Sequence, residues 1–163
     1  MTHKSPDHQP TTAFYAGSFN PFTTGHLNIV ERGLKIFPRI IIGIGLNPNK
    51  PHTPESIKQR VEEIDRAVAH LPGVSVTAYD TLTVDKAREM GATVLLRGVR
   101  SISDFDYERN LADINRSIAP DLDTVILFAD PVLGAVSSSM VRELKSYHHD
   151  ISQFLPHHST PNS

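Results

Sequence analysis

The sequence predicts a single α/β domain in which helices wind over both faces of a five-stranded parallel sheet. Short apolar segments of strand length alternate five times with segments whose apolar residues recur at helical spacing. Residues 40–46 are β-branched and almost wholly apolar, which is typical of a strand buried on both faces. Because parallel strands need crossover helices, this alternation favours an open, doubly wound sheet with right-handed connections.

The first half of the chain contains two strands and two helices. Residues 13–16 form a short apolar strand that stops at Gly17, and apolar residues at helical spacing follow up to Phe37. After the second strand, at 40–46, Thr53 and Pro54 supply the hydroxyl cap and first-turn proline of a helix start. The helix that they begin carries one apolar stripe as far as Leu71.

The second half repeats the alternation. Strands are predicted at 74–78, 93–96 and 124–128, and helices at 82–90, 107–118 and 138–147, with a last short element at 151–155. Tyr79 and Phe128 are interpreted as packing residues. The helix at 107–118 is indicated by Tyr107, Leu111 and Ile114, which recur at intervals of four and three residues.

Three segments describe the organisation of the chain. Residues 13–156 form one domain without a linker, a repeat or a low-complexity tract. Residues 1–12, rich in proline, histidine and threonine, are predicted to be a disordered arm, and residues 157–163 a frayed end.

The composition excludes several classes of protein. The 163 residues suit one compact domain, and a formal net charge of -2 gives no reason to expect binding to nucleic acid. No apolar run approaches the roughly 18 residues of a membrane helix, and residues 1–12 lack the apolar stretch of a signal peptide. The absence of cysteine fits a reducing compartment. We therefore expect a cytoplasmic protein that binds neither nucleic acid nor membrane. The composition is compatible with a small anionic ligand.

The residues that stand out chemically all follow predicted strands. The loops at 17–26, 47–50, 97–100 and 129–139 come after the first, second, fourth and fifth strands. In doubly wound sheets, ligands bind at the carboxyl ends of the strands, near the point where the strand order reverses. These loops are therefore expected to converge on one site.

The first of these loops is the strongest signal. Gly17 lets the backbone turn sharply, and Gly25 and His26 open the following helix. A helix N-terminus presents free N–H groups and a partial positive charge, which suits a phosphate. His26 in that first turn can donate to a phosphate oxygen. The pattern indicates a phosphate-binding turn.

Residues 17–21, Gly-Ser-Phe-Asn-Pro, followed by Thr-Thr-Gly-His at 23–26, resemble the signature of nucleotidyltransferases with a T/H-x-G-H motif. The runs Arg-Gly-Val-Arg at 97–100, Asp-Phe-Asp-Tyr-Glu at 104–108, Val-Ser-Ser-Ser at 136–139 and Phe-Leu-Pro at 154–156 resemble the phosphopantetheine adenylyltransferase family. Four ordered motifs are far more specific than one glycine-rich loop. The resemblance covers about residues 13–156 and implies a Rossmann-like nucleotidyltransferase fold.

That family makes dephospho-coenzyme A and pyrophosphate from ATP and 4′-phosphopantetheine, a step of coenzyme A biosynthesis. The resemblance implies that the catalytic residues are His26, Lys50 and Arg97, with His26 on the transferred α-phosphate. The acceptor would be bound by Ser18, Lys50, Thr83 and Arg97. The ATP-binding residues would be Ser18, Phe19, His26, Gly98, Val99, Arg100, Glu108, Leu133, Gly134, Ala135, Val136, Ser137, Ser138 and Ser139.

The family also implies partners. Mg²⁺ is expected on the ATP phosphates rather than in an all-protein cage, a homohexamer is expected, and coenzyme A is a possible inhibitor. Two positions depart from the usual pattern: Ser18 stands where threonine is usual and keeps the hydroxyl, and Asn20 stands where aspartate is common and lacks the carboxylate.

The chemistry of the reaction agrees with these assignments. Phosphoryl-type transfer depends mainly on positioning and on stabilising charge. The nucleophile is a phosphate, already an anion, so direct in-line attack needs neither a strong base nor a covalent intermediate. The reaction needs cations that hold two polyanions together, and Lys50, Arg100 and His26 come from loops expected to converge, together with Arg97.

Alternatives stay open from the residues alone. Another enzyme of the superfamily, acting on nicotinate mononucleotide or transferring a cytidylyl group, fits the first loop equally well. A non-catalytic nucleotide-binding protein is a second alternative, although it would be expected to have lost His26 or Lys50. A flavodoxin-like or response-regulator module is disfavoured because its hydroxyl loop or acidic pocket is not seen. Taken singly, Lys50 is better interpreted as a solvated loop residue than as a catalytic one. For Glu108, an exposed surface carboxylate and a site residue are equally good interpretations.

Overall fold

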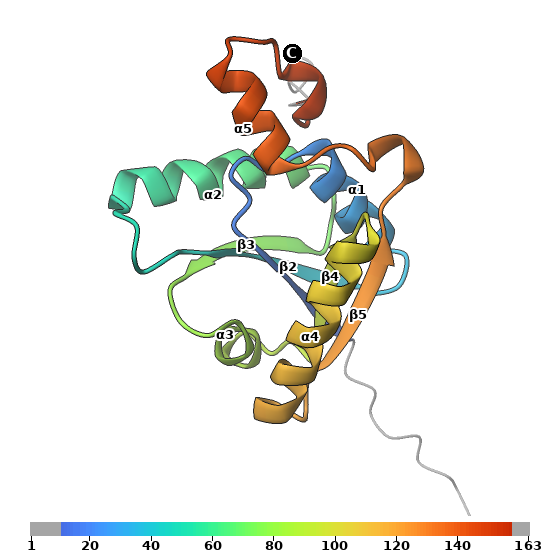
Figure 1. Ribbon diagram of the computed structural model, residues 1–163. Coiled ribbons are helices and arrows are strands. Elements are labelled where there is room, and N and C mark those ends of the chain that lie inside the picture. The colour runs from blue at the N-terminus through green and yellow to red at the C-terminus, as the bar shows by residue number, and fades with distance from the viewer. Residues whose placement is uncertain (1–10, 158–163) are drawn as a thin grey trace, which may run out of the picture.

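The computed structural model describes residues 11–157 (Figure 1). Its strands are β1 (Thr12–Gly17), β2 (Arg39–Gly45), β3 (Val74–Tyr79), β4 (Val94–Val99) and β5 (Asp123–Phe128). Its helices are α1 (Thr24–Gly33), α2 (Pro54–Val68), α3 (Thr83–Glu89), α4 (Ile102–Ile118) and α5 (Ser138–Ser146). Two 3-10 turns, η1 (Pro131–Leu133) and η2 (Ser152–Phe154), complete the order.

The five strands form one parallel sheet in the order β3-β2-β1-β4-β5. β1 lies at the centre, so the chain moves outward through β2 and β3 and then returns to the other side of β1 to form β4 and β5. The strand order reverses between β1 and β4. The predicted five-stranded, doubly wound α/β fold is therefore confirmed, and its switch point lies where ligands are expected.

Helices cover both faces of the sheet (Figure 1). On one face, Ala13 and Tyr15 of β1 belong to a core cluster that includes Val30 of α1 and Ile64 of α2. On the other face, Phe14 of β1 shares a second cluster with residues of α3 and the end of α4. β1 therefore alternates its side chains between two cores, as a central strand must. α5 lies beyond the sheet, above the carboxyl ends of the strands (Figure 1).

The helix start predicted at Thr53 is confirmed in detail. The Thr53 side chain accepts from the backbone N–H of Ser56, the Ser56 hydroxyl oxygen accepts from the N–H of Thr53, and Pro54 occupies the first turn. This reciprocal capping satisfies donors that have no partner inside the helix. Gly91, predicted to end α3, follows it with a φ of 75°, a conformation that glycine adopts without cost.

One packing prediction was wrong. Phe128 is 67% exposed at the end of the edge strand β5, whereas Tyr79 is buried as predicted. The apolar stripe of α4 identifies a helix correctly, but that helix begins at Ile102 and much of the stripe faces away from the core, with Ile114 59% exposed and Ile118 51% exposed. Apolar residues at helical spacing identify one face of a helix, but they do not show whether the protein core covers that face.

The predicted boundary between the N-terminal arm and the domain was placed one residue too late. Thr12 is the first residue of β1 and pairs with Arg39 of β2, so the strand extends into the range 1–12. Residues 1–10, and residues 158–163 of the predicted frayed end, lie outside the described residues. Among the helices that the structure describes, none is both long and apolar enough to span a bilayer.

Candidate active site

A cavity of about 390 Å³ opens at the carboxyl ends of β1 and β4, beside the N-termini of α1 and α5. We call it the first cavity. It lies at the switch point of the sheet, as predicted. The predicted site residues that line it are Ser18, Phe19, His26, Arg97, Gly98, Arg100, Glu108, Leu133, Val136, Ser137, Ser138 and Ser139.

The other predicted site residues lie outside the lining of this cavity. Lys50 is exposed on the loop between β2 and α2 and is not among the residues that line the first cavity. Thr83 begins α3, and its hydroxyl lies 2.9 Å from the hydroxyl of Tyr79. Val99 is buried in the sheet, while Gly134 and Ala135 sit on the connection to α5.

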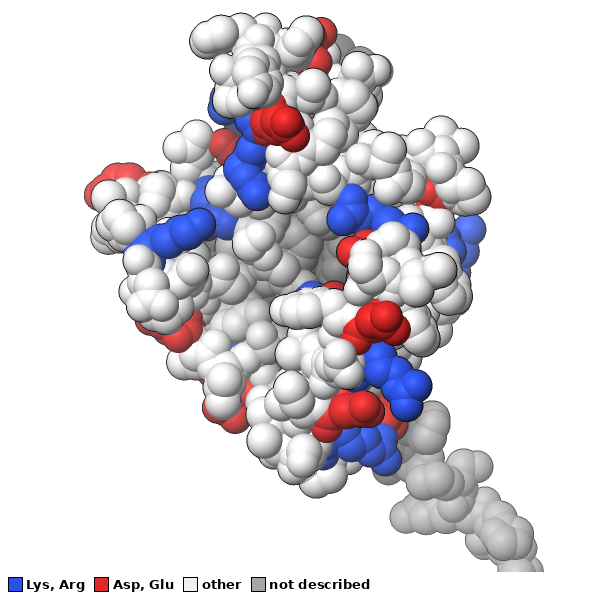
Figure 2. Space-filling model, in the orientation of Figure 1, with Lys and Arg blue, Asp and Glu red and all other residues white. Residues whose placement is uncertain are grey.

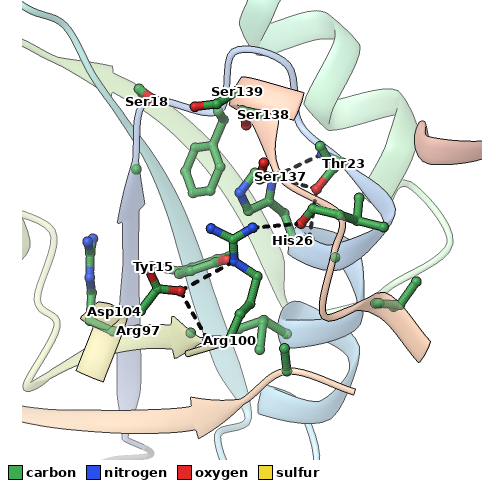
Figure 3. A pocket seen from close by; sticks show the side chains of 18 of the residues that line it. Tyr15, Ser18, Thr23, His26, Arg97, Arg100, Asp104, Ser137, Ser138 and Ser139 are labelled. Atoms are coloured by element: carbon green, nitrogen blue, oxygen red, sulfur yellow. Dashed lines mark hydrogen bonds and ion pairs between the residues drawn. The ribbon is translucent and has the colours of Figure 1, made fainter. Parts of the chain in front are cut away.

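The sequence between β1 and α1 holds His26 by a second capping box. Thr23 is the N-cap of α1, and its side chain accepts from the backbone N–H of His26 at 3.4 Å. In return, Nδ1 of His26 accepts from the backbone N–H of Thr23 at 2.9 Å. Because an amide must donate, Nδ1 carries no proton, and the proton of the neutral ring is on Nε2. Figure 3 shows the two residues joined in this way at the cavity.

His26 is neutral at pH 7 in this environment. Burial, followed by the positive charges of Arg100 and Arg97, lowers its pKa to about 4. The rings of Phe19 and Phe22 flank the imidazole, with centroids 5.0 and 5.5 Å away. His26 was expected to act as a cation. It is instead a neutral hydrogen-bond donor, because apolar walls and neighbouring arginines both oppose its protonation.

Arg97 is held rigidly by Glu108. Nε and Nη2 of Arg97 donate to the two carboxylate oxygens of Glu108, each at 2.7 Å, and Nη1 donates to the carbonyl of Ala16. Burial opposes the charge of Arg97, but the hydrogen bonds and attraction of Glu108 outweigh it and raise the arginine pKa. Glu108 is buried on α4, so the interpretation of it as an exposed carboxylate is wrong. The pair fixes a positive charge in the wall of the cavity.

Arg100 is oriented by two elements. Its backbone N–H donates to the Asp104 carboxylate at 3.1 Å, its Nε lies 3.4 Å from the same carboxylate, and its Nη1 donates to the carbonyl of Val136 at 3.2 Å. These contacts are drawn in Figure 3. Arg100 thereby connects the start of α4 to the loop before α5. Asp104 was quoted only as part of a motif, and its role as the partner of Arg100 was not predicted.

The N-terminus of α5 faces the same space. Ser137 caps the helix by accepting from the N–H of Met140, and the hydroxyl of Ser138 donates to the carbonyl of Pro21 at 2.8 Å. Arg142, one turn later, donates to the carbonyl of Asn20 and to the hydroxyl of Ser139. Sequence reasoning missed Arg142, although a basic residue one turn beyond three serines could have indicated it.

The turn after β1 is shaped by close packing. A Cβ on Gly17 would lie 2.9 Å from the ring of Phe19, so only glycine fits there without displacing that ring. Phe19 itself has a φ of 46°, which is uncommon for a residue other than glycine. The same ring packs against His26. Gly17 and Phe19 therefore set the position of the wall against which the histidine lies.

Together these groups give the first cavity the features that favour a polyanion. Two helix N-termini, a neutral imidazole donor and three arginines, Arg97, Arg100 and Arg142, border one cavity. Helix N-termini attract phosphate through free N–H groups and the helix dipole, and arginine matches phosphate geometry.

Comparisons with known proteins find relatives over most of the chain. The model of the cytidylyltransferase-like family matches residues 14–144. A phosphopantetheine adenylyltransferase from Porphyromonas gingivalis is 53% identical over 144 residues, which are 88% of this chain and 93% of that protein. The enzyme of the same name from Bacteroides thetaiotaomicron is 46% identical over 144 residues, 88% of this chain and 94% of that protein.

Solved structures support the fold. A bifunctional NMN adenylyltransferase/ADP ribose pyrophosphatase from Francisella tularensis superposes with a TM-score of 0.69 at 16% identity, over 93% of this chain and 46% of that one. The same protein complexed with AMP and a manganese ion gives a TM-score of 0.66 at 18% identity. This chain spans less than half of that bifunctional protein. By its family match and its curated relatives, the chain belongs to the cytidylyltransferase-like family and, within it, to the phosphopantetheine adenylyltransferases.

Proposed function

We propose that this protein transfers AMP from ATP to 4′-phosphopantetheine, releasing pyrophosphate and forming dephospho-coenzyme A, by direct attack of the acceptor phosphate. The observation that carries the proposal is the convergence of two helix N-termini, His26, Arg97 and Arg100 on one cavity. No side chain in that lining is needed as a covalent nucleophile, because the acceptor phosphate supplies one. The reaction is thus the positioning of two polyanions and the stabilisation of charge.

The triphosphate of ATP would lie against the N-terminus of α5. Ser137 and Ser138 open this helix, and Arg100 stands opposite, held by Asp104 and by the carbonyl of Val136. Backbone N–H groups there can bind phosphate oxygens without reorganising. Mg²⁺ would be bound mainly through the phosphates, as is usual for this ion, and would help neutralise the leaving pyrophosphate. Within residues 11–157, no group of three or more potential ligands forms a metal cage.

His26 would donate from Nε2 to a non-bridging oxygen of the α-phosphate. The capping box fixes the tautomer, so the donor is in place before the substrate binds. As negative charge gathers on the transferring group, this hydrogen bond strengthens. Loss of one preorganised donor of this kind typically costs roughly 10²–10³ in rate.

The acceptor phosphate would be bound beside Ser18 and Arg97. An arginine has five N–H donors, and Glu108 and Ala16 engage three of those of Arg97, which leaves two for a ligand. Lys50 and Thr83, which the family resemblance assigns to the acceptor, stand outside the cavity. Lys50 would join the acceptor phosphate only through a movement of the loop between β2 and α2.

The choice of acceptor is tested by pyrophosphate release from ATP with each candidate in turn. We expect turnover with 4′-phosphopantetheine and none above background with nicotinate mononucleotide. Turnover with nicotinate mononucleotide alone would show that the acceptor is misassigned. Release of pyrophosphate with neither acceptor, despite tight ATP binding, would favour a non-catalytic nucleotide-binding protein.

The assembly we propose is a homohexamer, as the family resemblance implies. Its support in this structure is the apolar face of α4, where Tyr107, Ile114 and Ile118 are each more than half exposed. Large apolar patches on a soluble protein mark interaction surfaces. Coenzyme A would compete for the first cavity because it contains both the adenylate and the phosphopantetheine arm of the product. A cytoplasmic location follows from the need for ATP and agrees with the cysteine-free sequence.

A further inference from the structure

A second cavity, of about 400 Å³, lies behind the loop that follows β1. Its walls come from α2, from α5 and from the segment around η2. Phe22, Ile64, Val141 and Leu155 give it an apolar interior. The proposed reaction uses none of this interior, since ATP and its acceptor meet in the first cavity.

Four basic side chains surround this interior: Arg60, Arg66, Arg142 and Lys145. Glu63 is the one acidic residue among the lining residues. Figure 2 shows basic atoms gathered between α5, at the top, and α2, at the left. A chain with a formal net charge of -2 therefore concentrates positive charge at this cavity.

These four cations also lack partners of opposite charge. Among the residues that the structure describes, none of the four forms an ion pair with a carboxylate. Arg32, Lys35, Arg39 and Lys50 also lack such a pair among the described residues, but they do not line this cavity. What distinguishes the four is that they gather around one apolar interior. Acids are available on α2, since Lys58 on that helix pairs with Glu62.

Arg60 is the most enclosed of the four. It is half-buried, its Nη2 donates to the carbonyl of Ser18, and its Nε is buried without a partner among the described residues. Burial lowers its pKa, only partly offset by Glu63. A buried guanidinium without a carboxylate is unfavourable, and a bound anion would stabilise it.

We propose that the second cavity is a binding site for a small amphipathic anion, with a phosphate or carboxylate head and an apolar body. The head would lie among the four cations, Arg60, Arg66, Arg142 and Lys145, and the body against Phe22 and Leu155. The ligand would contact the face of the loop after β1 that is turned away from the first cavity. Phe19 of this loop and Arg142 of α5 line both cavities.

A tryptophan reporter tests this site without relying on enzyme activity. The chain has no tryptophan, so Leu155→Trp in the full chain places a single fluorophore in the cavity wall. Hexyl phosphate, which carries both features of the proposed ligand, should change the emission saturably, with a dissociation constant on the order of 1 mM. Inorganic phosphate has only the charged head and 1-hexanol only the apolar body. Each should bind at least about tenfold more weakly than hexyl phosphate. The unsubstituted chain should show the same order of probes in the rise of Tm.

Charge variants locate the binding. In the reporter protein, Arg66→Ala with Lys145→Ala should weaken hexyl phosphate at least about fivefold, because two charged contacts are lost. Lys58→Ala with Arg109→Ala removes the same charge outside this cavity and should leave the affinity unchanged. Arg100→Ala, in the first cavity, and saturating ATP should also leave it unchanged.

The proposal is overturned if hexyl phosphate causes no saturable change in either measurement, or if 1-hexanol binds equally well. It is also overturned if Arg100→Ala or ATP abolishes binding while the Arg66 and Lys145 variant retains it, because the probe would then occupy the first cavity. Since the readouts are emission and Tm, failure of the proposed adenylyl transfer would not alter either conclusion.

Discussion

The backbone N–H of Thr23 donates to Nδ1 of His26 at 2.9 Å, so the residue that caps α1 also selects the tautomer of the histidine. The side chain of Thr23 is almost fully buried, and its hydroxyl lies 3.1 Å from the same ring nitrogen. One short motif thereby begins a helix, aims its N-terminus at the first cavity and orients the donor that stands there.

The hydroxyl of Thr23 can be tested with a pair of variants. Thr23→Val keeps the size of the side chain but removes the cap, and should lower the free energy of unfolding by about 1 kcal/mol. It should also lower kcat for adenylyl transfer more than it raises KM for ATP, because the position of the imidazole is loosened. Thr23→Ser keeps the hydroxyl and should stay close to the wild type in both. Urea unfolding and steady-state kinetics measure the effects, and equal behaviour of the two variants would contradict this role.

His26 should make the protein sensitive to mild acid. Its pKa is about 4 in the folded chain, below the unperturbed value of about 6.5, so the unfolded state binds the proton first as pH falls. The free energy of unfolding should therefore fall below pH 6.5, by about 2 kcal/mol between pH 7.5 and pH 5, and stop falling on this account near pH 4. His26→Gln should lack this component.

Urea unfolding at several pH values separates this effect from the titration of carboxylates. His149→Gln, at an exposed position, serves as the control and should follow the wild type. If the curves of the wild type and His26→Gln run parallel from pH 7.5 to pH 5, the lowered pKa of His26 is wrong.

Glu108 should act through Arg97. Glu108→Gln leaves a desolvated guanidinium without its carboxylate, so it should destabilise the fold by roughly 2–4 kcal/mol and raise KM for the acceptor more than KM for ATP. Asp113→Asn removes a carboxylate from an exposed ion pair with Arg109 on the same helix and should cost less than about 0.5 kcal/mol. Kinetics with each substrate varied, together with urea unfolding, measure both variants. If KM for the acceptor is unchanged in Glu108→Gln, then Glu108 does not contribute to acceptor binding.

The exposed face of α4 should hold subunits together. Ile114→Asp with Ile118→Asp places two charges on that face and should shift the protein from the proposed hexamer to smaller species. Ile36→Asp introduces a charge at a similarly exposed isoleucine away from α4 and should leave assembly intact. Sedimentation velocity distinguishes the species. If the variant with both α4 substitutions is still a hexamer, the interface does not lie on this face of α4.

The fold followed closely from the sequence because its signals are local. Buried parallel strands read as apolar runs, and hydroxyl caps, Pro54 and Gly91 mark helix boundaries by their own chemistry. What packs against a given face of a helix cannot be read from the local sequence. The stripe through Tyr107 and Ile114 is apolar in either case, and only the arrangement of the layers shows that it is turned outward.

The location of the site could be predicted from the sequence, but most of its side-chain contacts could not. The sheet order brings the loops after β1, β4 and β5 together, as parallel topology requires. The ion pair of Arg97 with Glu108 links β4 to α4, and the charge state of His26 depends on burial and on arginines that are far away in the sequence. Such contacts cannot be derived from spacing. Lys50 illustrates the opposite case: its loop follows β2, yet its side chain is not among those that line the first cavity.

The most direct test of the central claim is a comparison of turnover and ATP binding in His26→Ala. If neutral His26 donates to the transferring phosphate in the first cavity, kcat for adenylyl transfer to 4′-phosphopantetheine should fall roughly 10²–10³-fold, while the dissociation constant of ATP changes less than about threefold. Single-turnover measurement of pyrophosphate release, with ATP affinity determined by calorimetry, gives both quantities. A kcat close to that of the wild type would show that the transfer does not depend on this residue.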